Sequence, residues 1–154
     1  MGTKRFIAWV ATFSILALPV FAPAAEKGHD MDLGEKIFSG RVGPWTGEAR
    51  LVDMKAQMEK SGVSAKALAK LPASHHLMVT LTDPKTGKPV TDVAGSAEIK
   101  GPDKASSSKV TLVVMGGHIG ADVNLPKAGK YAFRVSAEGG GHKGSAEFPY
   151  ELKK

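Results

Sequence analysis

Imidazole and thioether side chains are the metal-binding candidates in this chain, which has five histidines, six methionines and no cysteine. Met115 and His118 stand three residues apart around Gly116 and Gly117, in the stretch VVMGGHIGADVNLP. A tight glycine turn can bring both side chains toward one point. Thioethers select Cu(I), and imidazole suits copper, iron and zinc. The spacing indicates a soft metal site, although simple packing at a glycine turn explains it equally well.

A second group of candidate ligands lies in the stretch SHHLMVTL. In a strand, His76 and Met78 share one face, while His75 points to the other. A further candidate, His142, ends the glycine run GGGH and could close over the site as a lid. Each also has a structural interpretation, because Met78 can fill the core, His75 can cap a strand, and His76 and His142 can simply be solvated.

The N-terminus has the features of a secretory signal peptide. Lys4 and Arg5 precede an apolar run from Phe6 to Phe21, and small residues at Ala22 and Ala24 fit a cleavage site. We therefore assign residues 1–25 to a cleavable signal and expect an exported, periplasmic protein. Residues 26–44 are polar and glycine-rich, which predicts a flexible segment that includes His29 and Met31.

Composition excludes several classes of function. Removing Lys4 and Arg5 lowers the formal charge from +6 to +4, and the remaining lysines are scattered, so nucleic-acid binding is disfavoured. Without cysteine, the domain must be held by an ordinary core and not by disulfides. No GxSxG, HExxH or phosphate-binding glycine loop followed by a helix is found, so we expect no enzyme activity.

Period-two hydrophobicity dominates residues 45–154, which we assign to a single domain. Seven short strands are predicted, at about 45–54, 75–82, 92–100, 109–115, 119–125, 131–137 and 145–152. Turn signals separate them, which predicts an all-β, immunoglobulin-like antiparallel β-sandwich. Tyr131 after Gly129 is typical of a tyrosine corner, and Pro149 places the last strand at a sheet edge.

A short helical insertion is predicted between the first two of these strands. The stretch KAQMEKSGVSAKALAKLP contains helix-forming residues, with Ser64 as an N-cap and Pro72 as a stop, and Gly62 divides it.

Two stretches resemble known families. MGGHIGADVNLPKAGKY resembles a segment of Tp34-type periplasmic iron-uptake accessory proteins, and SHHLMVTLTDPKTGKPVTD is similar to the opening of YtkA-like and CopC-like exported domains. The resemblance implies an immunoglobulin-like fold with Met115 and His118 as the ligand pair, one of His75 or His76 as the strand histidine, and His142 as a weaker match. Ile119 departs from the pattern, because it stands where the iron-uptake proteins have tyrosine. The helical insertion and the lack of an obvious acidic ligand environment are further departures.

We therefore expect an exported metal-binding protein, with copper as Cu(I) or Cu(II) favoured and ferrous iron as the second candidate. It would act as a carrier or accessory for an inner-membrane transporter or an oxidase-assembly protein. The expected ligands are Met115, His118, His76 or His75, Met78 and His142. The alternative is a non-metal interaction module that docks on a protein of the cell envelope.

Overall fold

The computed structural model describes residues 33–154. Eight strands and three short helices follow one another in this range. In chain order they are β1 (Glu35–Val42), β2 (Trp45–Asp53), α1 (Met54–Lys60), α2 (Ala65–Leu68), β3 (His75–Thr82), β4 (Ala94–Lys100), η1 (Lys104–Ser106), β5 (Ser108–Met115), β6 (His118–Val123), β7 (Gly129–Gly139) and β8 (His142–Leu152). The assigned signal peptide, together with His29 and Met31, lies outside the described residues.

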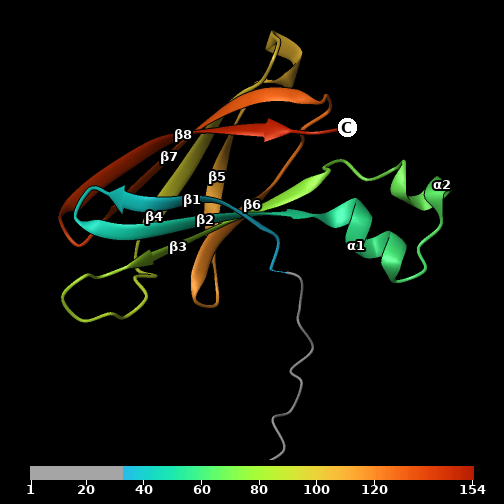
Figure 1. The fold of residues 1–154 in the computed structure, drawn as a ribbon. Helices are drawn as coiled ribbons and strands as arrows, with labels where there is room; N and C mark the ends of the chain where they lie inside the picture. Colours follow the sequence, from blue (N-terminus) through green and yellow to red (C-terminus); the bar gives the residue numbers. More distant parts are fainter. Residues whose placement is uncertain (1–32) are drawn as a thin grey trace, which may run out of the picture.

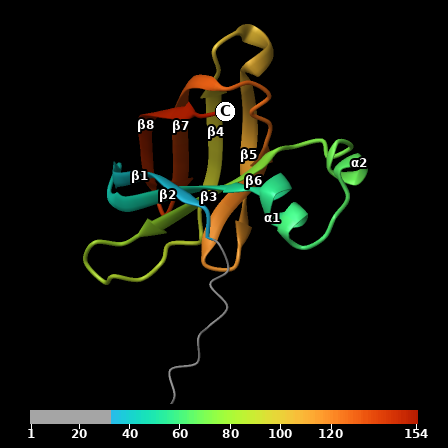
Figure 2. The same cartoon turned by 45° about the vertical axis from the view of Figure 1, so that its right-hand side comes forward.

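All strand pairs are antiparallel, in the order β1-β2-β3-β6-β5-β4-β7-β8. The sheet folds over on itself into two layers, and β1 and β2 run across the direction of β4, β7 and β8 (Figures 1 and 2). The two ends of the strand order also meet, since the ring of Phe38 in β1 stacks on that of Phe148 in β8 with centroids 4.6 Å apart. The predicted all-β sandwich is therefore confirmed.

Strand β1 differs from the sequence-based expectation, because residues 35–42 were assigned to a flexible segment and instead pair with β2 through the turn after Val42. The register shifts between Lys36 and Phe38, which marks a bulge. The shift leaves Ile37 and Phe38 both half-buried, so period two is interrupted. The sandwich consequently has eight strands where seven were predicted.

Alternation along the strands builds the core. In β3 the residues His75, Leu77, Val79 and Leu81 are buried, while the intervening side chains are only half-buried. The largest fully buried side chains come from the five strands β1, β3, β4, β6 and β7: Phe133, Leu77, Leu81, Ile99, Ile119, Val42, Val79, Val123 and Val135. Strand β3 therefore presents His76 and Met78 to the outer face of its sheet.

The predicted helical insertion is present as α1 and α2, which project to one side of the sandwich (Figure 1). Asp53 caps α1 by accepting from Ala56 N at 2.9 Å, and Ser64 caps α2 as expected. Gly62 separates the two helices with a φ of 87°. Within residues 33–154, none of the helices has the length and apolar character needed to span a membrane.

The tyrosine corner is also present. The hydroxyl of Tyr131 donates to the carbonyl of Lys127 at 2.7 Å, which ties the loop before β7 to that strand. Strand β8 lies at the end of the strand order, as Pro149 predicted.

Candidate metal centre

The β5–β6 hairpin carries two of the predicted ligands. Met115 and His118 are directly opposite each other across the two-residue turn of Gly116 and Gly117, so their side chains share a face. Gly116 adopts a φ of 61°, which a glycine accommodates without strain. The predicted convergence of these two side chains at the turn is therefore consistent with the fold.

Strand β3 brings a second histidine to the same face. His76 is paired with Asp122 and Met78 with Gly120, so both lie beside β6 on its outer side. The rings of His76 and His118 approach to a centroid distance of 6.4 Å with an interplanar angle of 87°. Four of the six predicted ligands, Met115, His118, His76 and Met78, therefore lie on one outer face formed by β3, β6 and β5.

The other two predicted ligands lie elsewhere. His75 faces inward and is only 7% exposed, and its Nδ1 is 2.7 Å from the hydroxyl of Ser74. Of the adjacent pair, His76 is therefore the residue that lies on the outer face of the sheet. His142 begins β8 opposite Gly139, and β5, β4 and β7 separate it from β6 in the strand order.

The two outer histidines have unlike environments. His76 Nδ1 is 2.7 Å from Asp122 Oδ1. For His118, burial lowers the pKa, and the neighbouring His76 lowers it further. Since only a neutral imidazole can ligate a metal, this shift keeps His118 ready for ligation at neutral pH.

Asp122 and Gly120 were not identified from the sequence. They follow His118 at intervals of two in β6, so alternation alone places all three on one face. Among residues 33–154, no group of three or more histidine, aspartate or glutamate side chains is arranged to hold a metal ion. The remaining candidate donors on this face are the thioethers of Met78 and Met115.

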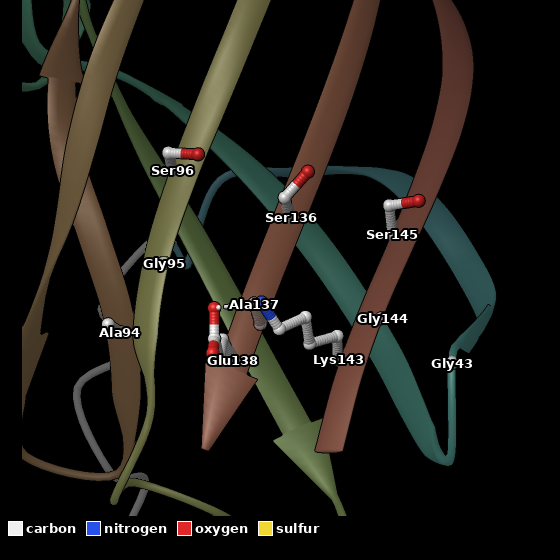
Figure 3. A pocket seen from close by; sticks show the side chains of 10 residues that line it. All are labelled: Gly43, Ala94, Gly95, Ser96, Ser136, Ala137, Glu138, Lys143, Gly144 and Ser145. Carbon is white, nitrogen blue, oxygen red and sulfur yellow. Dashed lines mark ion pairs between the residues drawn. The ribbon is translucent and has the colours of Figure 1, made fainter. Parts of the chain in front are cut away.

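A groove on the described surface is separate from this face. It has a volume of about 730 Å³ and lies over β4, β7 and β8, where Ser96, Ser136 and Ser145 line it (Figure 3). An ion pair of 3.1 Å between Lys143 and Glu138 borders it. None of the predicted ligands lines this groove.

Comparisons with known proteins show which fold this chain has, but they do not assign it to a family. No protein-family model and no curated protein sequence matches the chain. Similar solved structures include copper-reconstituted P19 from Campylobacter jejuni, with a TM-score of 0.58 and 16% identity over 78% of this chain and 98% of that one. A copper-bound variant of FetP from uropathogenic Escherichia coli matches with a TM-score of 0.53 and 14% identity over 78% and 95% of the two chains.

A second structure of FetP, as isolated after expression in the periplasm of E. coli, matches with a TM-score of 0.50 and 17% identity over 79% and 93% of the chains. At these identities the comparisons establish a shared fold. The resemblances to YtkA-like, CopC-like and Tp34-type proteins stay predictions.

Proposed function

We propose that this chain is a metal-binding protein that holds copper on the outer face of β3, β6 and β5. The observation that carries the proposal is the approach of the His76 and His118 rings to 6.4 Å. Met115 lies directly opposite His118, and Met78 is on the neighbouring strand. The outer face therefore presents two imidazoles, from β3 and β6, together with the thioether of Met115 and that of Met78.

The donor set favours copper over other metals. Thioether sulfur selects Cu(I), while carboxylate-rich oxygen sites suit harder ions. Because thioether sulfur is a soft ligand, a site of two imidazoles and one or two thioethers suits copper better than iron or zinc. P19 and the FetP variant, two structural neighbours whose structures contain copper, support the same choice. Ferrous iron is the second candidate.

The cellular role we propose is that of a non-enzymatic carrier or accessory in metal handling. The N-terminal sequence indicates export, and one of the FetP neighbours was expressed recombinantly in the periplasm of E. coli. The outer face is open, with Met115 42% exposed, so a bound ion would be accessible for transfer. An inner-membrane transporter or an oxidase-assembly protein is the proposed recipient.

The proposal is tested by titrating the purified mature protein with Cu(I), Cu(II), Fe(II) and Zn(II) against competing chelators. We expect one tight Cu(I) site in the wild type, and a loss of at least tenfold in affinity in His76→Ala and in His118→Ala. Met115→Ala should weaken Cu(I) more than Cu(II), because it removes the soft ligand.

Matched controls use the same residue types away from the face. His142→Ala changes an exposed histidine on β8, and Met58→Ala changes a methionine of α1. Both should bind copper like the wild type. Equal affinity in His118→Ala and His142→Ala would contradict the proposed site.

A second candidate function is protein docking, favoured by the apolar end of β5. Val113, Val114 and Met115 are 56, 46 and 42% exposed, and exposed large hydrophobic side chains are otherwise rare on the described surface. If the wild type binds no metal, a Val113→Ser, Val114→Ser variant that loses a partner retained by the wild type would support this function.

A further inference from the structure

His76 and Asp122 form a hydrogen-bonded pair that determines where the imidazole proton lies. They face each other across β3 and β6, with 2.7 Å between His76 Nδ1 and Asp122 Oδ1. An ionised carboxylate can only accept a hydrogen bond, so His76 Nδ1 must donate. In a neutral ring this leaves the lone pair on Nε2. His76 Nε2 makes no hydrogen bond to residues 33–154.

Gly120 provides the space that the Nε2 edge of the His76 ring occupies. A Cβ added at Gly120 would lie 2.9 Å from His76 Nε2 and 2.8 Å from the carbonyl oxygen of Leu77. Real Cβ atoms do not approach other atoms so closely, so any side chain at position 120 would clash with the ring of His76. Only glycine leaves room for the ring in this place. His118 precedes Gly120 by two residues on the same face, and its ring is the one 6.4 Å away.

We propose that Asp122 is a positioning residue that aims His76 Nε2 across Gly120 at a metal shared with His118. The inference rests on the proposed copper site and names the groups that preorganise it. A carboxylate behind a ligating imidazole fixes its tautomer and orientation and raises its basicity as a ligand.

The first test measures the tautomer of His76 in the metal-free protein by long-range ¹H–¹⁵N correlation spectroscopy at neutral pH. The wild type should show a protonated Nδ1 and an unprotonated Nε2. In Asp122→Ala the carboxylate is absent, so the Nε2-protonated form should appear. Glu151→Ala removes an exposed carboxylate from β8 and should leave the His76 spectrum unchanged.

A second variant tests the aim of the ring independently of the tautomer. Gly120→Ala should keep the proton on His76 Nδ1, hydrogen-bonded to Asp122, but displace the His76 ring, which would weaken the nuclear Overhauser contacts between the His76 and His118 rings. The amide spectrum of core residues in β7 reports whether the variant is folded.

Copper affinity then connects these signatures to the site. We expect Asp122→Ala to lose about tenfold to 100-fold in Cu(I) affinity, as for other partners of ligating histidines, with Glu151→Ala unaffected. An Nδ1-protonated His76 in Asp122→Ala, or a changed tautomer with unchanged affinity, would overturn the inference. If the wild type itself binds no copper, the proposed function fails, and the tautomer measurement alone decides whether Asp122 aims His76.

Discussion

Ser74 offers the sharpest test of how this sandwich is held together. Its hydroxyl accepts a hydrogen bond from the backbone N–H of Leu125 at 2.9 Å and lies 2.7 Å from His75 Nδ1. Ser74 is 8% exposed and Leu125 4%, so water cannot easily replace either contact. One small side chain therefore joins the loop before β3 to the loop after β6.

Replacing Ser74 with alanine leaves the Leu125 N–H buried without a partner. An unsatisfied buried donor costs about 1–3 kcal/mol, and the lost contact to His75 adds to this, so we expect Ser74→Ala to lower the free energy of unfolding by about 2 kcal/mol. For a domain of this size that loss corresponds to a Tm decrease of roughly 6–10 °C.

The assay is urea denaturation of the mature protein, followed by tryptophan fluorescence and circular dichroism. Ser39→Ala is the matched control, because Ser39 is exposed on β1, and it should change stability by less than about 0.5 kcal/mol. A Ser74→Ala protein as stable as Ser39→Ala would refute the reasoning, since the Leu125 N–H would then have to be satisfied by another group.

Three further predictions concern the stability of the domain. Burial lowers the pKa of His75 in the folded state, so the unfolded chain binds more protons below pH 6.5. The free energy of unfolding should therefore fall as the pH decreases from 6.5 through the pKa of the folded state. Denaturation between pH 7.5 and 5 should show this fall, and a His75→Gln variant should lessen it. Tyr131→Phe should lose about 1 kcal/mol in the same assay, because the 2.7 Å bond to the Lys127 carbonyl disappears, and an unchanged midpoint would show that the corner is not stabilising. Gly43→Ala should lower the free energy of unfolding by more than about 2 kcal/mol, because φ is +61° and the new Cβ would lie 2.5 Å from Gly144 Cα. Gly87 has a similar φ of +68° but open space around it, so Gly87→Ala should lower the free energy of unfolding by less.

Much of the fold could be predicted from local patterns. Alternation in β3 to β8 identified the sandwich, and Ser64 and Tyr131 identified a helix cap and a loop contact that the structure contains. Strand β1 could not be found in this way, because its bulge breaks the alternation and its stability comes from Phe38 packing on Phe148, which lies 110 residues further along the chain.

The candidate site shows the same division. Spacing alone placed Met115 with His118 and His76 with Met78, but it could not pair the two strands, since β3 and β6 are joined by hydrogen bonds across more than forty residues. It also gave no means of choosing His76 over His75 until the buried side of β3 was known. Asp122 contacts His76 only because β3 pairs with β6, so this interaction could not be predicted without the strand order.

The meeting of β1 with β8 has a consequence for the folding reaction. Tyr150 donates to Glu35 at 3.1 Å across a sequence separation of 115 residues, so this seam closes a very long chain loop. Such contacts have a high entropic cost, and sandwiches rich in them fold slowly. We expect the seam to form after the rate-limiting step, so that Phe38→Leu accelerates unfolding and leaves the refolding rate nearly unchanged. The sandwich would then open first at the seam, while β3 and β6, which carry His76 and His118, stay paired.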